Sequence, residues 1–196
     1  MKRLILISSF LSSVILFACF APAVNGQDQN VLANAMRITG DRFTVSVKTP
    51  KGANVYAATP PSGSVMNAID KGLTDLFEVA KKNGYFKKLN YTDYSIFIGN
   101  PDRTTNSQGA YSPDIATPSK QYAGSVYDQG GFIYVAGMVI SNEPCAFVLA
   151  THTKDFERVS NVVRYEGEHL VLYHNDRQRY AATADHSKGG SHPILQ

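Results

Sequence analysis

The chain has 196 residues, of which 43% are hydrophobic, 18% are charged and none is tryptophan. This composition excludes a disordered chain, a collagen and a small disulfide-rich protein, because it holds enough apolar material for one core and only two cysteines. The length predicts a single domain, and the formal net charge is +3, from 19 basic and 16 acidic residues.

The N-terminal segment 1–26 has the pattern of a secretory signal peptide. Two basic residues precede an apolar stretch over 4–20, and small residues follow it. Signal peptidase prefers small residues, so cleavage is expected after Ala23 or Gly26, and the mature chain is then secreted or periplasmic. Two alternatives stay open. One is a retained membrane anchor. The other is lipidation of Cys19, which lies in a segment that resembles a bacterial lipobox and would leave the protein lipid-anchored.

Removal of this leader changes the charge and the cysteine count. The remaining segment 27–196 has a net charge of +1, because the leader holds two basic residues and no acidic one. A nearly neutral chain without a run of lysine or arginine predicts no nucleic-acid partner. No transmembrane span is expected after cleavage. Cys145 then remains alone, so no internal disulfide is expected, and its apolar neighbours predict a buried thiol rather than a reactive one.

The first part of the mature chain is expected to contain a polar segment and two strands. Residues 27–40 are polar and are expected to form a flexible approach to a single domain over 41–196. Apolar and polar residues alternate over 43–48, which is typical of a half-buried strand, and 54–58 is expected to return as a second strand.

The middle of the chain predicts a helix followed by three strands. Apolar residues recur at helical spacing over 64–82, and Ser64 is expected to cap this helix. Strands are expected at 94–98, 132–140 and 146–151. The last two are nearly continuous apolar runs, which predicts central places in the sheet. Residues 100–131 are rich in Pro, Gly, Ser, Thr and Asn, and a loop of this length is typical of a lid, a binding loop or a disordered segment. Its tyrosines favour an ordered flap, which is a candidate cover for a site, or simply pin the loop to the domain.

A second helix is expected from an Asp155 cap to about His174. Together these elements predict one α+β domain, in which an antiparallel or mixed sheet of about four to five strands is packed by two main helices. A histidine-rich tail spans 174–196. Its apolar residues Ile194 and Leu195 indicate that the tail docks onto the domain.

Histidines and carboxylates are concentrated at the C-terminal end of the chain. All histidines except His152 lie in the segment 169–196. In the second expected helix, Glu166 falls on the apolar stripe and His169 falls at its edge, so both side chains lie on one helix face. Burial of both groups is unfavourable unless they are hydrogen-bonded or bound to a metal. A buried Glu–His hydrogen bond without a function, or a helix turned so that both groups reach water, explains the pattern equally well.

The segment Tyr165-Glu166-Gly167-Glu168-His169 resembles the His-Glu-x-x-His helix of zincin metallopeptidases, with tyrosine in the first histidine position. The resemblance implies that Glu166 is the general base and that His169 is a zinc ligand. Tyr165 departs from the motif, because a neutral phenol is a poor zinc ligand. Glu168 is a further candidate site residue within the same motif. The later segment 183–185 is similar to a ligand segment of the aspzincins, which are small secreted peptidases.

A metal site is also expected without any zincin pattern. The second helix and the tail supply enough nitrogen and oxygen donors for a divalent transition metal such as zinc, iron, manganese or copper. With Glu166, the candidate donors are His169, His174, Asp176, Asp185, His186 and His192.

The sequence therefore predicts an exported metal-dependent hydrolase, distantly zincin-like, that acts on a peptide or a small molecule. Two metal-free alternatives are acid–base hydrolysis by Glu166 and His169, and a nuclease that uses Asp176, His186 and His192. The competing class is a non-catalytic secreted binding or assembly protein whose Glu/His cluster is structural. Self-association stays open.

Overall fold

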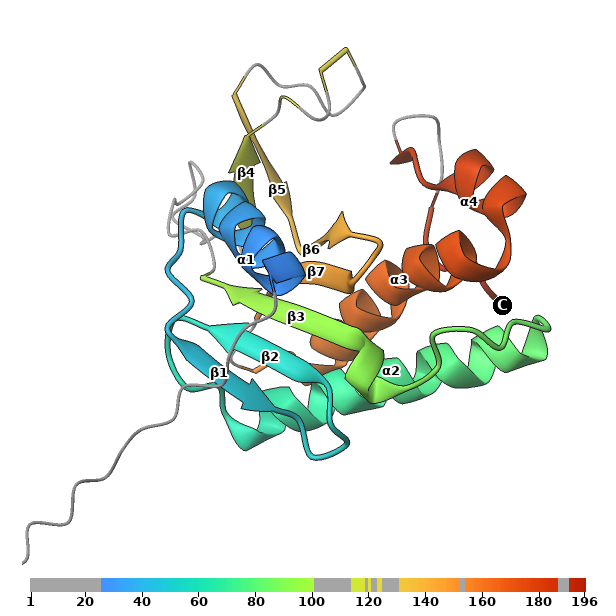
Figure 1. Cartoon of the computed structure of the whole chain (residues 1–196), viewed down its shortest axis with the longest axis horizontal. Helices are drawn as coiled ribbons and strands as arrows, with labels where there is room; N and C mark the ends of the chain where they lie inside the picture. Colours follow the sequence, from blue (N-terminus) through green and yellow to red (C-terminus); the bar gives the residue numbers. More distant parts are fainter. Residues whose placement is uncertain are drawn as a thin grey trace, which may run out of the picture.

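A five-stranded mixed sheet forms the centre of the molecule, with one helix on one face and two long helices on the other (Figure 1). The computed structural model describes residues 26–100, 114–118, 120, 123–124, 131–151, 154–186 and 191–196. The helices are α1 (Gly26–Thr39), α2 (Gly63–Lys82), α3 (Phe156–Asn175) and α4 (Arg177–Thr183), with a short 3-10 helix at Tyr91–Asp93. The strands are β1 (Val45–Lys48), β2 (Asn54–Ala57), β3 (Tyr94–Gly99), β4 (Ile115–Pro118), β5 (Phe132–Val135), β6 (Gly137–Ser141) and β7 (Cys145–Ala150).

The main sheet has the strand order β1-β2-β3-β7-β6. Strands β2, β3 and β7 run parallel to one another, and an antiparallel strand pairs at each edge of this parallel core. Strand β7 is buried along its whole length, because α1 covers one face of the sheet and α2 and α3 cover the other. The predicted α+β class with a mixed sheet and two main helices is therefore confirmed.

Helix α2 begins slightly earlier than its apolar pattern suggests. The Ser62 side chain, rather than that of Ser64, accepts a hydrogen bond from the Val65 backbone N–H and caps the helix. Its other end closes at Asn83, and Gly84 follows with φ of +79°, a backbone conformation that suits glycine. The prediction of a helix ending near residue 82 is confirmed.

Helix α3 also follows its prediction closely. The Asp155 side chain accepts a hydrogen bond from the Arg158 backbone N–H, and the helix then runs to Asn175. Helices α2 and α3 pack closely because glycines replace side chains at their contact. Gly72 of α2 lies against Ser160 and Val163 of α3. This contact, together with the sheet, fixes the position of the face of α3 that carries the candidate site.

The segment 27–40 is not a flexible approach, and the structure corrects that expectation. It forms α1, and Val31, Ala35 and Ile38 are buried against the sheet. These three apolar residues share one helix face, although the glutamines and asparagines around them give the segment a polar composition. The folded domain therefore begins well before residue 41.

The apolar run 132–140 is two strands rather than one. Strand β5 pairs with β4 in a separate two-stranded sheet, and β6 pairs with β7 in the main sheet. Strand β6 lies at the edge of the main sheet and not in its centre. Its apolar side chains are explained by contacts with α3 and by the cavity that they line. The described part of the expected loop 100–131 includes β4, so this region is not wholly without strands.

The predicted signal peptide lies almost entirely in residues 1–25, outside the described residues, as does Cys19. Among the described residues, no helix is both long and apolar enough to cross a membrane.

The contact at Gly72 gives the first prediction. A Cβ at this position would clash with the Ser160 carbonyl oxygen and lie 2.7 Å from Val163 Cβ. Gly72→Ala should therefore lower the free energy of unfolding by about 1–3 kcal/mol, since α2 and α3 must separate. Urea unfolding followed by circular dichroism measures the change. Gly63→Ala in the same helix is the control, because no atom lies within 4 Å of its added Cβ. Equal unfolding midpoints for the two variants would refute the close contact.

Candidate metal centre

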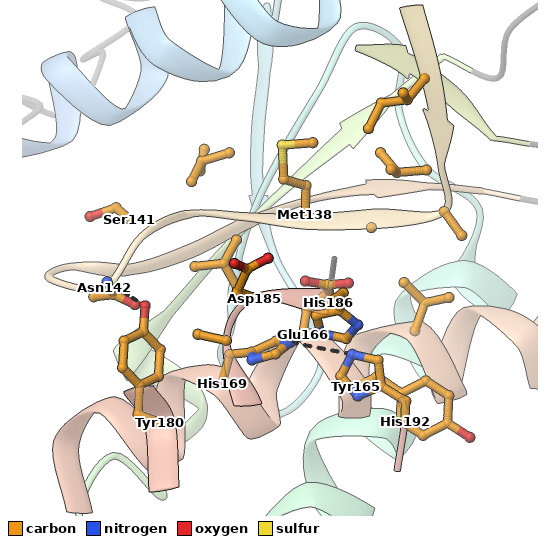
Figure 2. Close-up of a pocket in the computed structure, with 18 of the residues that line it drawn as sticks. Met138, Ser141, Asn142, Tyr165, Glu166, His169, Tyr180, Asp185, His186 and His192 are labelled. Atoms are coloured by element: carbon orange, nitrogen blue, oxygen red, sulfur yellow. Dashed lines mark hydrogen bonds between the residues drawn. The ribbon is translucent and has the colours of Figure 1, made fainter. Parts of the chain in front are cut away.

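Three histidine side chains converge beside helix α3. His169 projects from the helix, and His186 and His192 come from the tail beyond α4. The His169 Nε2 atom lies 2.9 Å from His186 Nε2 and 3.3 Å from His192 Nε2. Each of the three residues offers a ring nitrogen within 4.8 Å of the other two. Figure 2 shows the three imidazoles turned toward one another. Three imidazole nitrogens in this arrangement are a ligand set that suits zinc.

Burial keeps the imidazole at the centre of this cluster neutral. The His169 side chain is 7% exposed. Desolvation lowers the pKa of His169 to about 3, and the neighbouring His192 and His186 contribute to this lowering. The pKa of His186 is also lowered, first by desolvation and then by His192. Neutral imidazole is the form that binds a metal, so protons compete weakly for these two rings at neutral pH.

Glu168 holds the third histidine in place. Its carboxylate is fully buried and accepts a hydrogen bond from the Ile194 backbone N–H at 2.7 Å. The His192 Nδ1 atom lies 3.4 Å from the same oxygen, and Arg164 Nε lies 3.2 Å from the other one. A carboxylate beside Nδ1 favours the tautomer that leaves Nε2 free as a ligand atom. By contrast, the buried His169 Nδ1 has no hydrogen-bond partner in the described part of the chain, so packing and the Nε2 contacts with His186 and His192 orient that ring.

Tyr165 lies beside the histidine cluster and contacts one of its members. Its ring stacks on the His192 ring, with the centroids 4.9 Å apart and the planes at 12°. Tyr165 takes the first position of the zincin-like segment, and a histidine from the tail lies over it. The helix thus contributes one imidazole to the cluster, and the tail contributes two.

Glu166 lies on the same face of α3 and reaches the edge strand β6. A Cβ at Gly137 would lie 2.8 Å from Glu166 Cγ, so the glycine makes room for this side chain. Desolvation raises the pKa of Glu166 to about 8, although a hydrogen bond from the Val139 backbone N–H lowers it in part. A carboxyl group with a pKa near neutrality is able both to accept and to release a proton.

A cavity of about 810 Å³ lies between β6, α3 and α4. This volume is typical of a small-molecule or substrate site. Apolar side chains of β5 and β6 line one wall (Figure 2). Glu166 and the three clustered histidines all line this cavity, as do Tyr180 and Asn142.

The structure does not bring every predicted donor to the cluster. His174 points elsewhere, and its Nε2 lies 2.8 Å from the Asn142 carbonyl oxygen and 3.6 Å from Cys145 Sγ. The Asp176 side chain caps α4 by accepting a hydrogen bond from the Arg179 backbone N–H, and it accepts a second one from the Tyr85 hydroxyl. His174 does not join His169 because the two residues lie on different faces of α3, five residues apart along the helix. Asp185 lines the cavity but is not a member of the cluster.

The predicted docking of the tail is confirmed, and two arginines that sequence reasoning missed secure it. Leu195 is fully buried in the core. Arg164 donates a hydrogen bond to the Leu195 carbonyl oxygen, and Arg179 donates one to the Ile194 carbonyl oxygen, each at 2.8 Å. Arginines that bind backbone carbonyls leave no pattern in the sequence, because the tail positions carry no complementary charge.

The prediction for Cys145 is also confirmed. Its side chain is fully buried, and the described part of the chain contains no other free cysteine. Burial raises the pKa of this thiol to about 12, so the nucleophilic thiolate is absent at neutral pH.

Comparisons with known proteins return no relative of this chain: no family model, no curated protein and no solved structure matches it.

The raised pKa of Glu166 predicts a pH-dependent stability in metal-free protein. A group whose pKa rises from 4.5 to about 8 on folding contributes stability below pH 4.5 and loses it as the pH rises through 8. Between pH 5 and pH 8.5, the free energy of unfolding of the wild-type protein should therefore fall by at least about 1 kcal/mol more than that of Glu166→Gln. Urea unfolding in EDTA at both pH values measures this. Parallel losses in the two proteins would show that Glu166 titrates normally.

Proposed function

We propose that this protein is a metal-dependent hydrolase in which His169, His186 and His192 hold a divalent transition metal, with zinc as the best fit. The observation that carries the proposal is the convergence of three ring nitrogens on the wall of an open cavity. Three neutral nitrogen ligands are typical of catalytic zinc sites, which keep a further position open. When bound, such a metal lowers the pKa of water and polarises a carbonyl group.

Glu166 is the proposed proton-transfer group. Its carboxyl group lines the same cavity as the histidines, and its pKa of about 8 lies near neutrality. A nearby cation favours the carboxylate form, so metal binding should lower this pKa and prepare Glu166 to accept a proton from water. Glu166 then returns the proton to the leaving group. These are the roles that the zincin resemblance implies for Glu166 and His169.

The substrate class follows from the cavity and remains broad. An apolar wall faces a polar wall of histidines and carboxylates, which suits a peptide or another amide or ester with an apolar portion. The leader pattern of the segment 1–26 supports an exported enzyme.

The metal content of the purified protein tests the proposal. We expect about one equivalent of zinc by elemental analysis, and loss of that metal in His169→Ala. Glu166→Gln should keep the metal and lose hydrolysis of fluorogenic peptides and chromogenic esters, because only proton transfer is removed. His174→Gln is the matched control, since His174 lies on α3 but outside the cluster.

Two results would contradict the proposal in different ways. Less than about a tenth of an equivalent of any transition metal, with no thermal shift on addition of zinc, would exclude the metal centre. Bound zinc with no hydrolysis that depends on Glu166 would instead support the non-catalytic binding protein.

Glu168 gives a separate prediction about metal affinity. Glu168→Gln removes the negative charge beside His192 Nδ1 but keeps a similar shape. Metal affinity should fall about 10–100-fold, as for other residues that orient a metal ligand. Competition with a zinc chelator measures the affinity, and circular dichroism checks that the fold is intact. Unchanged affinity in a folded variant would exclude an orienting role for Glu168.

A further inference from the structure

A turn at one end of the molecule presents lysines around an exposed aromatic ring. The segment 81–88 reads Lys-Lys-Asn-Gly-Tyr-Phe-Lys-Lys and runs from the last two residues of α2 into the turn that follows the helix (Figure 1). We define these residues as the basic tip. Phe86 in the tip is 72% exposed, more than the two other large hydrophobic side chains that are exposed in the described part of the chain. A single exposed phenylalanine is common on protein surfaces, but this one is distinguished by its ordered backbone and by the lysines that accompany it.

The backbone on either side of Phe86 is fixed by α3. The Asn175 Oδ1 atom accepts hydrogen bonds from the backbone N–H groups of Phe86, at 3.1 Å, and Lys87, at 2.9 Å. Its Nδ2 atom donates to the Lys87 carbonyl oxygen at 3.0 Å. One side chain at the end of α3 thus holds the tip by three hydrogen bonds, so the outward direction of Phe86 is built into the fold.

The neighbours of Phe86 point inward and anchor the tip. The Tyr85 hydroxyl donates to Asp176, and Leu89 packs against the core. Lys88 has φ of +60°, in the left-handed region that non-glycine residues rarely adopt, and its carbonyl oxygen accepts a hydrogen bond from the Tyr94 hydroxyl. Phe86 is therefore exposed within an ordered turn.

The charge around Phe86 is mainly positive. Lys81, Lys82 and Lys87 are exposed. Lys88 lies 3.8 Å from Glu143, so its charge is partly neutralised. Glu78, one turn earlier on α2, is the nearest acidic residue along that helix and is also exposed. Asp176, which accepts the hydrogen bond from Tyr85, is a further acidic residue beside the tip. The eight-residue basic tip thus combines one protruding ring with three exposed lysines.

We propose that the basic tip docks this protein onto an anionic lipid surface. Phe86 enters the interfacial region of the bilayer, and the lysines lie among the anionic headgroups. An aromatic ring flanked by lysines is the combination that interfacial anchors use, and each lysine near an anionic membrane strengthens binding about fivefold. An acidic protein would attract the lysines but would need a pocket for the ring. This proposal is independent of the metal centre.

The absence of tryptophan from the sequence allows a site-specific test. In protein without residues 1–25, which keeps every element described above, Phe86→Trp introduces a single tryptophan at the tip, and its emission can be excited selectively over that of the tyrosines. With vesicles that contain phosphatidylglycerol, its emission should shift to the blue and be quenched by brominated acyl chains. With phosphatidylcholine alone, or at high salt, both effects should be much smaller. Val47→Trp is the matched control, because Val47 is 38% exposed beside Lys48 on the edge strand β1, outside the basic tip; its emission should not change.

Vesicle sedimentation of two further variants completes the test. Phe86→Ser should weaken binding to the anionic vesicles at least about fivefold, and replacement of Lys81, Lys82 and Lys87 by Gln should weaken it about a hundredfold. Binding that is the same with and without phosphatidylglycerol would overturn the proposal. So would unquenched Phe86→Trp, or equal binding of Phe86→Ser and wild type. Retention on a soluble acidic polymer that depends on the lysines but not on Phe86, without vesicle binding, would identify an acidic macromolecule instead.

Discussion

The burial of the Glu168 carboxylate is the constraint on which the candidate site depends. A fully buried carboxylate is strongly unfavourable unless charged or polar partners surround it. Here the partners are Arg164, the Ile194 backbone N–H and His192. Two of these three belong to the tail, so the same interaction that compensates the buried charge also docks the tail and orients one of its imidazoles. The stacking of the Tyr165 ring on His192 adds a second contact that positions His192 relative to α3.

The rest of the fold places α3 so that this interaction meets a cavity. Glycine contacts bring α2 and α3 close together beneath the sheet, and α3 therefore lies along the edge strand β6. Gly137 on β6 leaves space for Glu166, whose neighbours in the cavity are the clustered histidines. Small residues at two separate contacts thus allow the close approach of α3 to α2 and of Glu166 to β6. The chemistry of the site depends on these glycines, although they carry no functional group.

The sequence predicted local features well and non-local ones poorly. Both long helices, the capping Asp155 and the buried Cys145 follow from periodicity or composition, which are properties of neighbouring residues. The prediction that Glu166 and His169 share a helix face is also local, and the structure agrees with it. Strand order is not local, so the apolar run containing β6 was wrongly expected in the sheet centre. The choice of His186 and His192 over His174 depends on the path of the tail, which α4 and backbone hydrogen bonds determine.

The way the tail is held affects how a metal would bind. Two of the three candidate ligands, His186 and His192, follow α4 in the tail. If such residues were not already positioned, ordering them would reduce the free energy of metal binding. The end of the tail is held without a metal by the burial of Leu195, by the hydrogen bonds from Arg164 and Arg179, and by the stacking of Tyr165 on His192. In a regular zincin-like helix, the backbone alone would position two ligands. Here Tyr165 occupies the first of those positions, and its ring stacks on His192 from the tail. Side-chain packing, and not helical geometry, therefore positions this candidate ligand in advance.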